Sequence, residues 1–200
     1  RLPAQGLEHK EIPFILEIDA TGKLINLVDT RSSEGKKLIG QRFLVPQGVK
    51  KTSGVAANLL WDSAEYVLGI DTRGNPERVA EQHAAFRERI ASLPNAAKAD
   101  TGIQAVLAFM QAFTPEYLES LPAFTDIQLT NPLMSFRLHG DFDLVCQRPA
   151  VVAQTATSPD EMPDGVCLVS GEAAAIERLH PAIKGVWGAQ TSGANIVSFN

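Results

Sequence analysis

The first part of the chain contains short apolar runs with the length and composition of β-strands. Residues 12–19 read I-P-F-I-L-E-I-D and residues 24–28 read L-I-N-L-V, with the turn sequence A-T-G-K between them. This arrangement predicts a hairpin. A third short strand is predicted at residues 42–46, after a loop rich in glycine and lysine at residues 35–41, and a fourth at residues 66–70.

The pattern then changes to helical spacing. Asn75 has the side chain of an N-cap, and Pro76 suits the first helical position. Pro94 follows the expected end of this helix. The residues that recur at helical spacing within it are Val79, His83, Phe86 and Ile90.

A second helix is predicted to begin at Asp100 and Thr101, a pair that suits a helix start. A third, short helical turn begins at the T-P-E sequence from Thr114 and ends at Pro122. The face of the second helix carries Ile103, Val106, Leu107 and Met110.

Strand-like sequence returns in the last third of the chain, at residues 133–138, 144–146 and 166–169, with an acidic loop at 159–165. The order is therefore strands, then helices, then strands, which favours an α+β fold over a doubly wound sheet. We expect an antiparallel sheet with a small helical layer, or with a helical insertion at about residues 75–122.

Composition places the chain among globular proteins with a real core, because 44% of its 200 residues are hydrophobic and 20% are charged. No apolar run approaches the roughly 20 residues that a membrane helix needs, so no membrane partner is expected. Cys146 and Cys167 are far apart in the sequence. They suit buried thiols in a reducing, cytoplasmic setting better than a disulfide framework.

Charge is distributed unevenly along the chain, whose total is −5. Residues 23–51 hold seven cations and two carboxylates, a local charge of +5 that leaves −10 on the remainder. Such a basic patch can follow a phosphate backbone even on an acidic protein, since salt screens charges beyond about 10 Å. A solvated surface without a nucleic-acid partner remains the alternative interpretation.

Motifs for catalysis and metal binding are missing from the sequence. None of the four histidines is paired with another histidine or a cysteine at metal-ligand spacing, and no C-x-x-C occurs. Lys184 precedes the glycine of its G-V-W-G run, whereas a phosphate-binding loop needs Gly-Lys followed by Ser or Thr. We therefore expect no enzyme activity, no catalytic residue, no metal and no cofactor.

The C-terminal stretch, residues 184–200, reads K-G-V-W-G-A-Q-T-S-G-A-N-I-V-S-F-N and has no acidic residue. Its amides and hydroxyls supply neutral hydrogen-bonding groups on a backbone that glycine allows to approach a ligand closely. The chain stops there without a terminating sequence, and it begins with Arg1. We expect it to be part of a longer protein.

Several uncommon strings occur together in one order. They are F-L-V-P at 43–46, K-K-T-S-G at 50–54, N-L-L-W-D at 58–62, Y-V-L-G at 66–69, C-L-V-S-G-E at 167–172, L-H-P at 179–181, I-K-G-V at 183–186 and G-A-Q-T-S-G-A-N at 188–195. In this order they resemble the large subunit of the type I-C CRISPR surveillance complex, Cascade (the Csd subtype). Residues 95–165 match only loosely.

The resemblance implies that residues 1–200 form the N-terminal domain of a longer large subunit. Such a subunit recognises the protospacer-adjacent motif on double-stranded DNA, helps to open the duplex and stabilises the R-loop in antiviral defence. Its implied partners are double-stranded target DNA, the crRNA-containing Cascade subunits and the helicase–nuclease effector. Phage anti-CRISPR proteins are a further candidate partner.

Two kinds of residue suit such a surface, because cations position the DNA backbone and neutral amides or hydroxyls reach base edges. The candidate DNA-binding residues are Lys50, Lys51, Thr52, Ser53, Asn58, Lys184, Gln190, Ser192 and Asn195. They fall into two groups far apart in sequence, residues 50–58 and residues 184–195. If both groups contact the same DNA, they must lie on one face of the fold.

Each candidate also has a structural interpretation that the sequence leaves open. Asn58 can cap or satisfy buried backbone, and the amides and serine of residues 190–195 can form turns. Trp61 and Tyr66 are expected in the core rather than stacked on bases. The alternative function is a docking module that anchors the large subunit to the crRNA 5′-end subunits without reading DNA.

Overall fold

The computed structural model describes residues 6–51, 54–114, 116–119, 121–155, 165–166, 171 and 173–174. The chain divides into two units, Arg1–Thr157 and Ser158–Asn200. In the second unit, β9 (Gly165–Val166) and β10 (Ala173–Ala174) pair antiparallel. The predicted strand at 166–169 lies outside the described residues beyond Val166.

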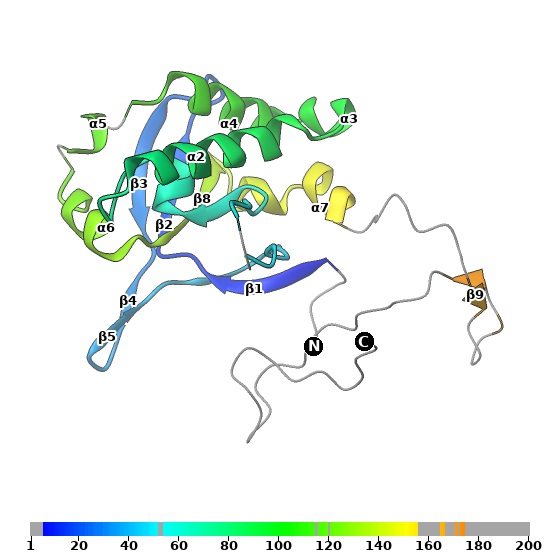
Figure 1. Cartoon of the computed structure of the whole chain (residues 1–200), viewed down its shortest axis with the longest axis horizontal. Coiled ribbons are helices and arrows are strands. Elements are labelled where there is room, and N and C mark those ends of the chain that lie inside the picture. Colours follow the sequence, from blue (N-terminus) through cyan, green and yellow to red (C-terminus); the bar gives the residue numbers. More distant parts are fainter. Residues whose placement is uncertain are drawn as a thin grey trace. The chain divides into compact units, whose positions relative to one another are not determined.

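A four-stranded sheet forms the centre of the first unit, in the order β3-β2-β8-β7 (Figure 1). Its strands are β2 (Phe14–Ile18), β3 (Leu24–Asp29), β7 (Trp61–Ser63) and β8 (Leu133–Leu138). The predicted hairpin is confirmed as β2–β3, and the strand predicted at 133–138 is β8. The sheet is mixed rather than wholly antiparallel, because β2 and β8 run parallel in its middle.

Two further strand pairs extend from the sheet. β1 (Leu7–Glu11) pairs antiparallel with β6 (Arg42–Pro46), the third strand predicted from sequence. β4 (Ser32–Glu34) and β5 (Lys37–Ile39) form a hairpin that Figure 1 shows standing away from the sheet. The prediction of a loop at 35–41 is therefore wrong for the β5 part of that segment.

A short helix, α1 (Ala64–Leu68), occupies most of the segment predicted as a fourth strand, so that prediction is wrong. All five residues are buried, and the helix ends at Gly69, whose N–H donates to the Glu65 carbonyl at 3.2 Å. The sequence signal is ambiguous because a short, fully buried apolar run has neither the alternation of a surface strand nor a polar helical face.

The predicted helices are confirmed as α2 (Pro76–Ala91) and α4 (Thr101–Ala112), with α5 (Glu116–Glu119) at the third turn. The Asn75 side chain accepts from Arg78 N, and Asp100 Oδ1 accepts from Gly102 N and Ile103 N, so both predicted N-caps are formed. The short helices α3 (Asn95–Lys98) and α6 (Phe124–Thr130) were not predicted, nor was the helix that follows β8.

The segment after β8 is helical, with a 3₁₀ turn η1 (Val145–Gln147) followed by α7 (Pro149–Thr155). The strand predicted at 144–146 is therefore wrong, and only Leu144 makes a bridge to Arg137. The Gln147 side chain accepts from Leu144 N at 2.8 Å, which closes the turn locally instead of leaving the backbone to pair with a strand.

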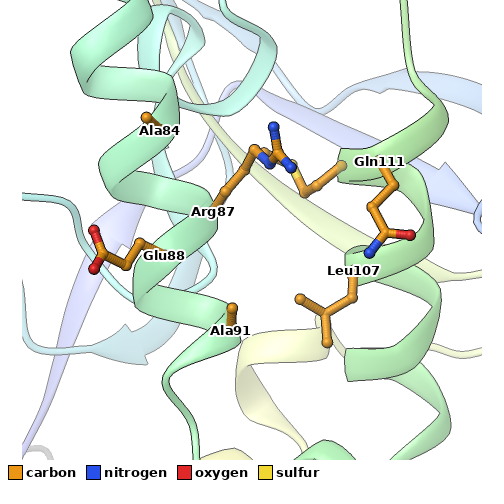
Figure 2. Close-up of a pocket in the computed structure, with 7 residues that line it drawn as sticks. Ala84, Arg87, Glu88, Ala91, Leu107 and Gln111 are labelled. Atoms are coloured by element: carbon orange, nitrogen blue, oxygen red, sulfur yellow. The ribbon is translucent and has the colours of Figure 1, made fainter.

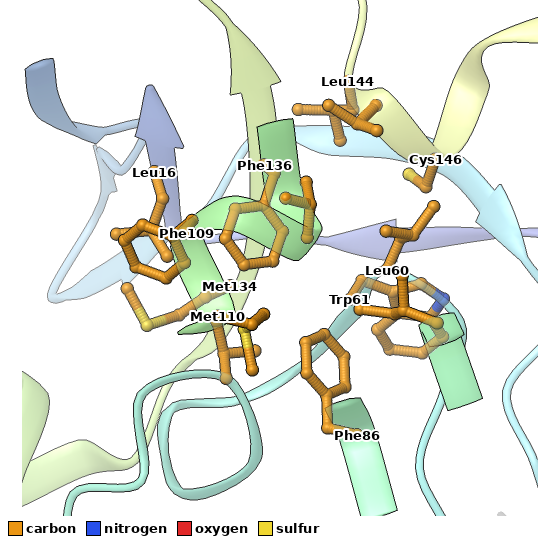
Figure 3. Packing of buried hydrophobic residues seen from close by; sticks show 14 of the residues in the cluster. Leu16, Leu60, Trp61, Phe86, Phe109, Met110, Met134, Phe136, Leu144 and Cys146 are labelled. Atoms are coloured by element: carbon orange, nitrogen blue, oxygen red, sulfur yellow. The ribbon is translucent and has the colours of Figure 1, made fainter. Parts of the chain in front are cut away.

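The core lies on both faces of the sheet. On one face α2 and α4 cover Phe136, which lies beside Phe109 at 5.4 Å and Phe86 at 6.4 Å between ring centroids (Figure 3). On the other face, Ser135 of β8 donates to the Leu60 carbonyl and contacts Cys146 of η1. The helical layer predicted from sequence thus packs on the sheet, and the fold class is α+β.

Candidate nucleic-acid interface

The predicted contact residues near the middle of the chain belong to one connection, residues 47–60 between β6 and β7, here called the anchored loop. Its first part is fixed by Gly48 N, which donates to Glu8 of β1 at 2.8 Å. Its path is closed by Val49 N, which donates to the side-chain oxygen of Asn58 at 2.9 Å. The two ends of the loop are therefore tied to β1 and to each other.

Asp62, at the start of β7, organises the end of this loop. Its side chain is only 2% exposed, and it accepts hydrogen bonds from Asn58 N at 2.9 Å and Ser63 N at 2.8 Å. The ammonium of Lys51 contacts both carboxylate oxygens, at 2.7 and 2.8 Å. A buried carboxylate with backbone donors and a cation is fully satisfied, so this network fixes Lys51 and Asn58 beside the start of β7.

Lys50 and Lys51 are adjacent in sequence but differ in their surroundings. The Lys51 ammonium pairs with Asp62 and also lies 3.8 Å from the centre of the Tyr66 ring. Lys50 is exposed, and it makes no ion pair with any residue that the structure describes. The cation available to an external phosphate on this loop is therefore Lys50, whereas the charge of Lys51 is largely used within the fold.

Leu60 carries backbone strain at the point where the anchored loop enters β7. Its φ is +63°, a conformation that non-glycine residues rarely adopt. The side chain is fully buried, and the carbonyl accepts from Ser135 Oγ at 2.9 Å. Burial and hydrogen bonding thus hold a backbone conformation that costs about 1–3 kcal/mol.

Asn58, Trp61 and Tyr66 have structural contacts. Asn58 is 5% exposed, and its side-chain oxygen accepts a hydrogen bond from Val49 N. Of the two roles that the sequence left open, DNA contact and satisfaction of buried backbone, this is the second. Trp61 donates to the Pro46 carbonyl at 2.8 Å, and Trp61 and Tyr66 are both buried. The expectation that these two aromatic residues belong to the core is confirmed.

Thr52, Ser53, Lys184, Gln190, Ser192 and Asn195 lie outside the described residues. Cys167 and the H-P turn at 180–181 do so as well. For these positions the sequence-based interpretation stands as a prediction.

The basic segment from residue 23 to residue 51 separates into paired and exposed cations. Arg31 forms ion pairs with Asp29 and Asp126, which joins the end of β3 to α6. Its guanidinium carbon also lies 4.5 Å from the centre of the Phe14 ring. Lys51 is exposed but pairs with Asp62, whereas Lys23, Lys36, Lys37, Arg42 and Lys50 are exposed and make no ion pair with a described residue. Sequence reasoning named only Lys50 and Lys51 among these seven as contact residues; the exposure of the β4–β5 lysines required the fold.

Burial shifts the pKa of one thiol and one imidazole in the described part of the chain. Burial raises the pKa of the Cys146 thiol to about 12, so it remains protonated at neutral pH. Burial also lowers the pKa of His83, whose Nδ1 lies 2.9 Å from the Tyr66 carbonyl. Among the described residues no cluster of histidine, cysteine and carboxylate side chains could hold a metal ion, and no helix is long and apolar enough to cross a membrane.

A shallow groove of about 300 Å³ separates α2 from α4 on the outer side of the helical layer. In Figure 2 the Arg87 side chain extends from α2 across this groove toward α4, where Leu107 and Gln111 lie. None of the predicted contact residues lines it. The groove and the anchored loop are therefore separate features.

Comparison with known families places these features in context. A sequence model described as CRISPR-associated protein (Cas_Csd1) matches residues 1–200. A search among curated proteins found no match to the chain. The match spans every residue, including 95–165, where the resemblance of individual strings is weakest. The chain therefore belongs to the Csd1 family of CRISPR-associated proteins and is a Cascade subunit.

Proposed function

We propose that this chain recognises the protospacer-adjacent motif on double-stranded DNA within the crRNA-guided complex, and that it helps to open the duplex and stabilise the R-loop. In such complexes base pairing reads the target and protein reads only the short motif. The chain needs no catalytic group for this role. Membership of a Cascade subunit family supports the setting, and the anchored loop supports the contact with DNA.

The observation that carries the proposal is that an exposed cation, Lys50, lies on a loop held by hydrogen bonds to the rest of the fold. Lys50 is exposed on a loop whose backbone is tied to Glu8, Asn58 and Asp62. A cation on a preorganised backbone loses less conformational entropy on binding than one on a free loop. Lys50 is therefore suited to position a DNA phosphate, and Lys51 to hold the loop that carries it.

Base readout in this proposal falls to neutral groups next to Lys50 and in the C-terminal stretch. Thr52 and Ser53 follow the lysine pair directly, and Gln190, Ser192 and Asn195 lie on a glycine-containing stretch that Lys184 precedes. Amides and hydroxyls are the side chains that donate to and accept from base edges in the major groove. Asn58 acts by shaping the loop, because its side-chain oxygen is already bonded to Val49 N.

The proposal is tested with Lys50→Ala in the assembled complex, on duplexes with and without the motif. Log affinity falls with log salt concentration, and removing one phosphate contact makes the magnitude of this slope (the salt slope) smaller by about 0.9. The affinity should fall for both duplexes, because a phosphate contact carries no sequence information. Arg89→Ala, on the exposed face of α2, is the matched control and should leave the slope unchanged.

A second candidate function, docking to the crRNA 5′-end subunits, is favoured by one observation. Phe142 is 96% exposed in the turn after β8, and Leu129 of α6 is 80% exposed. Large exposed apolar side chains are typical of protein contacts. If Phe142→Ser prevents assembly while Lys50→Ala leaves DNA affinity intact in assembled complexes, docking without DNA reading is the better account.

A further inference from the structure

The β4–β5 hairpin is an exposed feature of the described chain that the proposed function does not use. Every residue from Ser32 to Leu38 is exposed, and Figure 1 shows the hairpin standing away from the sheet. Gly35, at its tip, has φ +63° and no atom within 4 Å of the position of a Cβ. We call residues 32–39 the arm.

The base of the arm is a built junction. The Thr30 hydroxyl donates to the Ile12 carbonyl and accepts from Gln41 N, so one side chain joins three segments of chain. Backbone bonds run from Ile12 N to the Gln41 carbonyl at 3.0 Å and from Thr30 N to the Pro13 carbonyl at 2.9 Å. These bonds tie both strands of the arm to the β1–β2 connection.

Gly40 allows the closest approach at this junction. A Cβ at residue 40 would lie 2.8 Å from Pro13 N and 3.0 Å from Pro13 Cα, both backbone atoms that cannot move aside. The backbone of β5 can therefore leave the junction along this path only with glycine at position 40. The arm projects in a direction fixed by the fold.

The side chains at the end of the arm are mainly polar and basic. Lys36 occupies the turn beside Gly35, and Lys37 pairs in register with Glu34 across the two strands. Leu38 pairs with Ser33 and is 63% exposed, the one large apolar side chain at this end of the arm. The arm thus carries two cations against one carboxylate.

We propose that the arm lies in the major groove of the double-stranded target DNA, with Lys36 and Lys37 on the phosphate backbone and Leu38 against base or sugar atoms. This inference rests on the proposed function, which brings a DNA duplex to this chain. A two-stranded β-ribbon fits the major groove of B-DNA, whereas the deep, narrow major groove of an A-form helix does not admit it. Exposed lysines complement the phosphates that border that groove.

Composition favours DNA over a protein partner for the arm. The centre of a protein interface is depleted in lysine, glutamate and serine and enriched in aromatic residues. The arm has no aromatic residue, and its residues 32–37 read S-S-E-G-K-K. A single exposed leucine with two adjacent lysines suits an apolar contact inside a charged groove.

The test uses the assembled complex with Lys36→Ala and Lys37→Ala combined, on duplexes with and without the motif. Loss of two phosphate contacts makes the magnitude of the salt slope smaller by about 1.8. The ratio of wild-type to variant affinity should therefore fall about tenfold between 50 and 200 mM salt. Lys36→Arg with Lys37→Arg should keep the slope. Arg87→Ala with Arg89→Ala, on α2, removes the same charge elsewhere and should leave the slope unchanged.

Lys50→Ala measured in parallel separates this inference from the proposed function. If Lys50→Ala lowers the slope and the arm variant does not, the arm does not contact DNA and the proposed function stands. If neither variant changes the slope, both proposals are overturned. If the arm variant prevents assembly of the complex in mass photometry, the arm is a protein contact and the inference is overturned.

Discussion

Lys50 and Lys51 show how two identical neighbours take different roles through their contacts. The Lys51 ammonium compensates Asp62, which is 2% exposed, while Lys50 faces solvent. Removing one partner of a buried, hydrogen-bonded charge costs about 1–3 kcal/mol. We expect Lys51→Met to lower the free energy of unfolding in urea by that amount, because Asp62 keeps its two backbone donors but loses its cation.

The matched control is Lys50→Met, which should change the free energy of unfolding by no more than about 0.5 kcal/mol. Asp62→Asn combined with Lys51→Met should recover part of the loss, since the carboxylate that needs the cation is then absent. Equal destabilisation by the two single lysine changes would show that the ion pair does not support the loop.

Glu17 of β2 gives the fold a predictable dependence on pH. Its side chain accepts from Arg137 at 2.9 Å and lies 2.7 Å from His139 Nδ1, and these two bonds hold the pKa of Glu17 below its ordinary value of 4.5. A lowered carboxyl pKa gives stability that is present above the ordinary pKa and is lost as pH falls through the lower pKa of the folded protein.

Urea unfolding at a series of pH values between 7 and 3 measures this effect. The wild-type chain should lose more stability below pH 4.5 than Glu17→Gln, which cannot titrate. Parallel curves for the two proteins would mean that the Arg137 and His139 contacts do not favour the ionised carboxylate.

At the scale of elements, Asp100 joins α4 to the segment that follows β8. It caps α4, and its carboxylate contacts Arg148 Nε at 2.8 Å, while Arg148 also pairs with Asp141. We expect Asp100→Ala to lower stability by about 1–3 kcal/mol through loss of cap and ion pair together. Asp100→Asn keeps a cap acceptor and should lose less, as measured by thermal or urea unfolding.

The elements that sequence predicted well carry local signals. β2–β3 has two short apolar runs joined by a glycine-containing turn, and α2 and α4 have the caps Asn75 and Asp100, so each is specified within its own segment. Residues 64–68 and 144–147 lack such signals, and burial decided their conformation instead. The parallel pairing of β2 with β8 joins residues more than 100 positions apart, which spacing along the chain does not reveal.

The candidate site was predictable only in part, for a similar reason. The lysine pair is visible in the sequence, but the division of roles depends on Asp62, Asn58 and Tyr66, which the fold brings around Lys51. The arm was missed because S-S-E-G-K-K-L-I has no apolar alternation, and its strands form through a glycine turn and a junction at Thr30. Which lysines are exposed, and which are paired, depends on the fold and cannot be read from the spacing of residues along the chain.

At the scale of the whole molecule, charge separates a basic segment from an acidic remainder. The chain carries −5 in total, and residues 23–51 carry +5. Specific protein–DNA affinity draws on many contacts across an interface. The isolated chain should therefore bind duplex DNA weakly, and the assembled complex is the sample in which its DNA contacts are measurable.

The central claim is that the anchored loop meets target DNA, and a structure of the assembled complex on a motif-bearing duplex tests it most directly. The account predicts the Lys50 ammonium within about 3 Å of a phosphate oxygen. It also predicts that Lys51 remains on Asp62, as in the free chain. An anchored loop covered by another protein subunit, with no DNA within reach of Lys50, would contradict it.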